Sequence, residues 1–365
     1  MKLIYVLLFL IIFSFELFSQ VGRNFKVTEY GILNYADSKN VVTESVLKDK
    51  PRMDNTHLPP QLKIFAPKEQ NLEADTSKKS ELVGTRGTRF VIPENAFVDM
   101  TGNLVEGVVT VTVIEIIDEL DFLTSGIGLI YYSKYGKELY LISGGIFKIE
   151  YKLGDQKVKL APGKIIEVQF PDISPKETFS LYHMDESGVW NLKSSLSNND
   201  RIEAGTNDRD NYEGRKIVGV RIAQIDKPGY WNFAYPELQH TCLKGTIDDS
   251  KSAVGNELQL TVIALDVRGF FTRTVKDKEF SINSYKKRNV KVLVIDEKGN
   301  LGLSSQITSS DKNGSESLPD SPDNFKQSIG SIELKKIPTD IWGDEKSFRQ
   351  LLSFPQERYF VRYRK

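Results

Sequence analysis

Residues 84 to 150 constrain the possible folds more than any other part of the chain. Apolar residues alternate there with polar or small ones in short runs, as in 105–117, and glycines such as Gly144 and Gly145 interrupt the runs. Alternation with a period of two, bounded by turn residues, is typical of half-buried β-strands. Further runs of this kind, bounded by Gly or Pro, lie at 129–132, 139–142, 147–151, 158–160 and 165–170. This spacing predicts an all-β sandwich. Residues 84 to 150 also contain few of the side chains on which catalysis usually depends.

Shifts in composition predict the organisation of the rest of the chain. Residues 21–80 contain four prolines and end in a polar run, which predicts an irregular extension and linker. The folded part is predicted to be tandem β-sandwich modules. We expect a first β-sandwich over 81–175, a second β-rich segment over 176–235, a third β-sandwich over 236–345 with a mobile loop at 309–328, and an aromatic-basic tail over 346–365.

The first 20 residues have the composition of a signal peptide. Lys2 precedes an apolar run from Leu3 to Phe15, and Ser19 supplies a small residue near the expected cut. The run of about 13 residues is shorter than the ~20 needed to span a bilayer, which favours a cleaved leader over an uncleaved membrane anchor. We therefore expect export to the periplasm, the outer-membrane surface or the medium, and no transmembrane span in the mature chain.

Several motifs between residues 84 and 171 resemble a known module. They are Gly87-Thr88, Ile92-Pro93 with Ala96-Phe97, Gly107 before Val109-Thr-Val111, the acidic stretch Glu115 to Asp121, and Ser143-Gly144-Gly145-Ile146-Phe147. Together they resemble the sandwich module of ankyrins, netrin receptors and many exported bacterial proteins, which implies a role in protein contacts. Some relatives cut themselves at a His-Phe-Ser site, where this chain has Thr178-Phe179-Ser180. Because threonine has no imidazole to accept the serine proton, we expect the chain to stay whole.

The third folded segment resembles a second known module. Its strand-like runs at 243–248, 258–265, 277–282 and 290–295 are similar to the regulatory, transthyretin-like domain appended to carboxypeptidases and many surface proteins, with 329–334 as the last strand. The chain has Lys278 where that domain usually carries a glycine, two residues before a phenylalanine. The resemblance implies a small β-sandwich that spaces or stabilises and has no catalytic residues of its own.

Charge, cysteine and histidine content narrow the function classes. Basic and acidic residues balance at 49 each, so no global field attracts nucleic acid, and we expect no nucleic-acid partner. The single Cys242 cannot form an internal disulfide, and we expect a small buried hydrophobe there instead of a reactive thiol. His57, His183 and His240 lie at no metal-ligand spacing, so we expect structural or surface histidines and neither a metal nor a cofactor.

The acidic residues Asp118, Glu119 and Asp121 allow two interpretations. They could form a calcium loop, or they could be a solvated loop at the end of a strand. The oxygen positions do not follow the EF-hand order, which favours the solvated loop. The chain also lacks a Gly-rich phosphate loop, a nucleophile elbow and a paired-carboxylate framework, so we predict no catalytic residues.

Aromatic and basic clusters supply the candidates for interaction. Exposed aromatics suit protein or sugar contacts. The candidates are Tyr131, Tyr132, Tyr135 and Tyr140, for which a strand core is the alternative, and Arg358, Tyr359, Arg362, Tyr363 and Arg364 of the tail, for which an amphipathic edge strand is the alternative. The inferred apolar core includes Phe97, Val111, Phe147 and Trp231.

These observations predict a non-enzymatic exported protein of the cell envelope or cell surface that acts as a binding or scaffold module. Its partner would be a protein or an envelope polymer. Two alternatives stay open: an envelope hydrolase acting on polysaccharide or peptidoglycan, and an adhesin for host matrix proteins. Clustered, buried carboxylates in a cleft would favour the hydrolase, whereas flat aromatic surface and exposed acids would favour binding.

Overall fold

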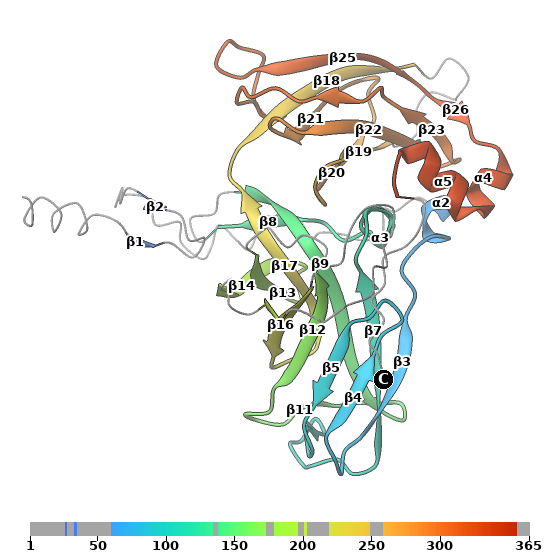
Figure 1. Ribbon diagram of the computed structural model, residues 1–365. Coiled ribbons are helices and arrows are strands. Elements are labelled where there is room, and N and C mark those ends of the chain that lie inside the picture. Colours follow the sequence, from blue (N-terminus) through green and yellow to red (C-terminus); the bar gives the residue numbers. More distant parts are fainter. Residues whose placement is uncertain are drawn as a thin grey trace, which may run out of the picture. The chain divides into compact units, whose positions relative to one another are not determined.

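A computed structural model describes residues 60–133, 138–172, 179–195, 219–248 and 258–355, together with the backbone of three short strands at 26–27, 33–34 and 201–202. Strands make up 53% and helices 10% of the structure, which confirms the predicted all-β class (Figure 1). Residues 51–131 and 138–365 form one compact unit, and residues 1–50 with 132–137 form another. In the latter, β1 (Lys26–Val27) pairs with β2 (Leu33–Asn34).

The first sandwich has a sheet of eight strands. Its order is β17 (Gly229–Glu237), β13 (Ser180–Met184), β14 (Trp190–Ser195), β8 (Ile130–Tyr132), β9 (Glu138–Leu153), β7 (Val108–Ile116) and β3 (Gln70–Asp75), with β10 (Gln156–Lys157) paired to β9. β17 also pairs with β9, from Tyr140 to Ile149. Strands from either side of residue 175, where the sequence suggested a boundary, therefore share this sheet.

The second sheet of this sandwich has five strands. Its order is β15 (Arg201–Ile202), β16 (Gly219–Ile225), β12 (Ile166–Asp172), β5 (Arg89–Ile92) and β4 (Ser80–Val83), and a separate pair joins β11 (Lys159–Leu160) to β6 (Phe97–Val98). Side chains from both sheets form one core, in which the rings of Phe147 and Phe170 lie 5.9 Å apart. The core positions inferred from alternation are confirmed, because Phe97, Val111, Phe147 and Trp231 are at most 1% exposed.

The second sandwich lies between residues 240 and 336. Its smaller sheet has the order β21 (Glu279–Tyr285), β18 (His240–Asp248) and β25 (Lys326–Glu333). Its larger sheet has the order β20 (Phe270–Val275), β19 (Leu258–Ala264), β22 (Asn289–Asp296), β23 (Asn300–Leu303) and β26 (Lys335–Lys336), with β24 (Ile307–Thr308) paired to β22. The five strands expected here are present, and β20, β23, β24 and β26 are additional to them.

Strand β9 contributes to both sandwiches. Its Phe147 and Ile149 lie in the first core, while Tyr140 and Ile142 lie in the core of the second. Hydrogen bonds reinforce the junction: Asn283 donates to the Tyr140 hydroxyl at 2.9 Å, and Arg268 Nε donates to the carbonyl oxygen of Ser143 at 3.1 Å. The shared strand and these hydrogen bonds therefore couple the two sandwiches.

Four short helices complete the described structure. They are α2 (Pro60–Lys63), α3 (Glu119–Ser125), α4 (Thr339–Gly343) and α5 (Glu345–Leu352). Phe348 of α5 stacks on Phe65, just after α2, with ring centroids 4.9 Å apart. Among the residues that the structure describes, no helix combines the length and apolar character needed to cross a membrane.

Candidate functional site

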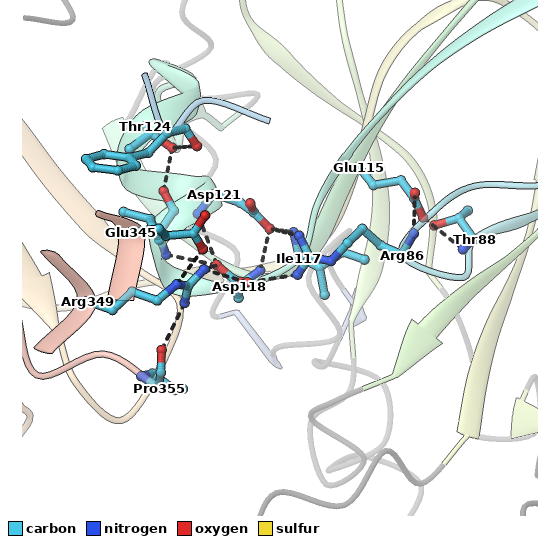
Figure 2. Close-up of polar contacts among 12 residues, drawn as sticks. Arg86, Thr88, Glu115, Ile117, Asp118, Asp121, Thr124, Glu345, Arg349 and Pro355 are labelled. Atoms are coloured by element: carbon cyan, nitrogen blue, oxygen red, sulfur yellow. Dashed lines mark hydrogen bonds and ion pairs between the residues drawn. The ribbon is translucent and has the colours of Figure 1, made fainter. Parts of the chain in front are cut away.

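The acidic stretch after β7 forms a helix start, not a solvated loop. Asp118 is the N-cap of α3, and its carboxylate accepts hydrogen bonds from the backbone nitrogens of Leu120 and Asp121, each at 3.1 Å. The Asp121 carboxylate in turn accepts from the nitrogens of Ile117 and Asp118 (Figure 2). This reciprocal pattern is a capping box. Asp118 and Asp121 are fully buried and Glu119 is 5% exposed, so the prediction of a solvated loop is wrong.

Two arginines neutralise these buried carboxylates. Arg86 donates to Asp118 at 2.8 Å and to Asp121 at 2.9 Å. Arg349 of α5, whose side chain is fully buried, donates to Asp118 at 3.0 Å and to Glu345 at 2.8 Å (Figure 2). The carboxylate oxygens of Asp118 and Asp121 are thus already engaged by guanidinium groups and backbone N–H donors. Charged groups are tolerated in a protein interior when they are paired and hydrogen bonded in this way.

Glu115 extends the same network on the first sandwich. Its carboxylate accepts hydrogen bonds from the backbone nitrogens of Arg86 and Thr88, each at 2.8 Å, and from Gln70 Nε2 at 3.0 Å. The side chain thereby satisfies backbone donors of the turn that carries Arg86. Glu115 is only 2% exposed, so it acts as a structural acceptor inside the protein.

Asp118 is held in its ionised form. Burial, the largest influence, opposes ionisation, but the charges of Arg86 and Arg349 and the backbone hydrogen bond from Asp121 together lower the pKa of Asp118 below its ordinary value. A carboxylic acid that donates a proton near neutral pH needs a raised pKa instead. Asp118 therefore lacks the electrostatics of a general acid.

An open polar groove lies on the smaller sheet of the second sandwich. Its volume is about 1090 Å³, and residues of β18, β21 and β25 line it together with the turn before β21 and Asp320. Hydroxyl groups of Thr246, Ser281, Ser328 and Ser331 alternate there with the charged groups of Lys244, Lys278, Lys326, Asp277, Glu279 and Asp320. Phe280, the one large apolar residue of the lining, is only 5% exposed, so the polar and charged groups share the accessible surface with glycines and the stems of the lysines.

Strand register arranges these groups in rows across the sheet. Lys244 pairs with Ser281 on one side and Ser328 on the other, and Thr246 pairs with Glu279 and Ser331. Between the rows β25 carries one extra residue, and Gly330 adopts a φ of 78°. A side chain at Gly245 would lie 2.8 Å from the carbonyl oxygen of Gly330, so glycine permits the close approach of the two strands.

Asp320 bridges two lysines at one end of the groove. Its Oδ1 lies 2.9 Å from Lys326 Nζ, and its Oδ2 lies 3.3 Å from Lys244 Nζ. Hydrogen bonds from Lys326 and then Lys244 lower the pKa of Asp320. The Asp320 side chain is 63% exposed, whereas that of Lys326 is 10% exposed. Lys326 is therefore the buried partner, whereas Lys244, at 46%, and the carboxylate are both exposed.

The loop that carries Asp320 is held in place by side-chain hydrogen bonds. Asn324 Nδ2 donates to the carbonyl oxygens of Ser315, Leu318 and Pro319 at 2.9 to 3.0 Å. Glu316 accepts from the backbone nitrogen of Asn283 on β21 at 3.1 Å. These bonds give the segment 309–325 a defined path, and its expected mobility stays a prediction.

Two of the predicted interaction tyrosines are core residues. Tyr131 is 4% exposed and packs its ring edge-on against Tyr182, and Tyr140 is 6% exposed and lies in the second core. The strand-core alternative is thus correct for both, and they offer no binding surface. Tyr132 is half-buried. Tyr135 and the tail residues Arg358, Tyr359, Arg362, Tyr363 and Arg364 lie outside the described residues.

The cysteine and the two described histidines lie in packed or hydrogen-bonded environments. Cys242 is fully buried, as expected, and burial raises the pKa of its thiol to about 11. His183 Nε2 lies 2.9 Å from the carbonyl oxygen of Pro228, and burial lowers the pKa of this histidine. His240 packs edge-on against Tyr140, and His57 lies outside the described residues. Within the described residues, no group of three or more His, Cys, Asp or Glu side chains could hold a metal ion.

Comparisons with known proteins identify no relative whose function could be related to this geometry. No family model matches the chain, and no curated protein matches it. Among solved structures it is similar to the gamma-CGTase from alkalophilic Bacillus clarkii, with 11% identity over 68% of this chain and 38% of that chain and a TM-score of 0.18. A bacterial adhesin from Mobiluncus mulieris gives 10% identity over 52% of this chain and 91% of that chain, with a TM-score of 0.15. Likenesses this weak carry no argument about function.

Proposed function

We propose that this chain is a non-enzymatic exported protein of a bacterial cell envelope or cell surface, and that it acts as a binding or scaffold module. The single observation that carries the proposal is the polar groove on the sheet β21, β18 and β25, an open surface with donors and acceptors already oriented by strand register. Export rests on residues 1–20 as a cleaved leader. The resemblance of 84–171 and 236–345 to sandwich modules of exported and surface proteins supports the same role.

The hydrolase alternative requires an acid and a base that are free to exchange protons. The best clustered acids, Asp118 and Asp121, are instead enclosed by Arg86 and Arg349. The groove acids include Asp320, whose pKa is lowered by its lysine partners, so it suits ion pairing better than proton donation. These arrangements support binding over catalysis.

Capture from an envelope extract tests the proposal. The chain from Val21 onward would be immobilised beside a Lys244→Gln/Lys326→Gln variant and a Lys335→Gln control, which removes a lysine that pairs with Glu333 on β25. We expect the wild type and control to retain an envelope component and the double variant to retain less of it. Retention of nothing by any form would overturn the binding role. A matrix protein of a host as the only retained partner would favour the adhesin.

A further inference from the structure

We propose that the cationic end of the groove binds a carboxylate of an acidic polysaccharide, with Lys244 and Lys326 as its ion-pair partners and Asp320 as an internal competitor for them. This inference rests on the proposed binding function and names the ligand class. Its elements are the bridging carboxylate, the row of hydroxyls beside it and the acids at the other end of the groove.

The carboxylate of Asp320 indicates the kind of group that the two lysines can bind. Both oxygens of Asp320 are used, one by Lys326 at 2.9 Å and the other by Lys244 at 3.3 Å, so the two ammonium groups are spaced to hold a single carboxylate. Because Asp320 is 63% exposed, water competes for its carboxylate in both ion pairs, and the pair with Lys244, in which both partners are exposed, contributes little. A carboxylate on a ligand that also gains other contacts can therefore replace it.

Hydroxyl groups beside the lysines supply those other contacts. Ser281 and Ser328 flank Lys244 across three strands, and Ser328 is exposed. Hydroxyls donate and accept hydrogen bonds, which matches the hydroxyls of a sugar ring. Phe280 is the one large apolar residue of the lining and is only 5% exposed, so it gives no ring on which an apolar side chain of a ligand could pack.

Acids at the far end of the groove limit how the ligand lies. Glu279 pairs with Thr246, one row beyond Lys244, which is about 7 Å further along the strands. Glu279 and Asp277 line that end together with Lys278, so these three side chains carry one net negative charge and disfavour a second carboxylate there. The ligand chain is therefore expected to cross the strands along the row Ser281, Lys244 and Ser328, with one carboxylate at the lysines.

Binding to polygalacturonate tests the inference, with neutral dextran and polyglutamate as comparison polymers. The chain from Val21 would be compared with Asp320→Asn, with Lys244→Gln/Lys326→Gln, and with Asp311→Asn as the matched control. Asp311 is also 63% exposed and pairs with Lys287, outside the groove. We expect Asp320→Asn to bind polygalacturonate about two- to fivefold more tightly, the range of an exposed ion pair, the lysine variant at least about tenfold more weakly, and the control as the wild type.

The gain in affinity cannot arise from misfolding, so Asp320→Asn keeps the test decisive even if a lysine variant folds poorly. Unchanged or weaker binding by Asp320→Asn would overturn the competitor role. No binding of polygalacturonate, equal binding of dextran, or equal binding of polyglutamate would overturn the ligand class. In each of these cases, continued capture of an envelope component would leave the proposed function standing, whereas loss of both would contradict the function as well.

Discussion

At the scale of single residues, Asp118 joins distant parts of the chain through its buried ion pairs with Arg86 and Arg349. The spacing of Asp118 and Asp121 before an apolar run is a capping pattern and was available in the sequence. Their burial was not, because the partner Arg349 lies 231 residues away along the chain. From its sequence alone, a cluster of acidic residues is predicted to be solvated, because the arginines that pair with it come from distant parts of the chain.

Replacing Arg349 with leucine should destabilise the protein by about 3 kcal/mol or more, because it leaves part of the buried charge of Asp118 uncompensated. Urea unfolding followed by circular dichroism measures the loss. The matched control is Arg273→Leu, which removes an exposed partner of Glu316 and should change stability by less than about 1 kcal/mol. Equal losses in the two variants would show that the buried network does not stabilise the fold.

The same carboxylate gives a pH dependence with a definite sign. Since the folded state lowers the pKa of Asp118 from its usual 3.8, its contribution is fully present above that value and is lost as the pH falls below it. The urea midpoint of the wild type should therefore fall more steeply below about pH 4 than that of Asp118→Asn. Parallel pH profiles for the two proteins would contradict the assignment.

At the scale of elements, β9 differs most from its prediction. Alternation predicts two strands, at 139–142 and 147–151, because Ser143-Gly144-Gly145 has the composition of a turn. The structure has one strand of 16 residues with a bulge against β17 at Phe233 and Ala234. Glycine signals a bulge as well as a turn, and only the pairing with β17 distinguishes the two.

Gly145→Ala should destabilise the first sandwich by about 2 kcal/mol or more. The added methyl carbon would lie 2.1 Å from the ring of Phe170, at a φ of 142°. Gly102→Ala is the matched control, because Gly102 also has a positive φ, of 99°, but nothing lies within 4 Å of the added carbon. Thermal melts that shift equally for both variants would mean that backbone strain, not the clash with Phe170, sets the cost.

At the scale of the whole molecule, the sandwich class and most strands follow from alternation and turn residues, whereas the groove does not. Lysines among serines and threonines on strands look like any solvated sheet face. What makes the groove is the pairing of β18 with β25, parallel in direction and far apart in sequence, and the return of Asp320 over them. Long-range pairings of this kind leave no local pattern.

The shared strand predicts that the two sandwiches unfold together. Tyr140 and Arg268 hold β9 to the second sandwich, so calorimetry of the wild type should give a single cooperative transition. Tyr140→Ala/Arg268→Ala should separate it into two. Two transitions in the wild type would show that the cores are energetically independent.

The fate of an envelope polymer tests the central proposal of binding without catalysis most directly. Labelled polysaccharide from the envelope would be incubated with the immobilised chain from Val21, eluted with salt, and its size distribution compared with that of the input. We predict that the polymer is retained and recovered at its original size, with retention reduced in Lys244→Gln/Lys326→Gln. Recovery of shorter fragments, produced by the wild type and absent from a blank matrix, would contradict the account and favour the hydrolase.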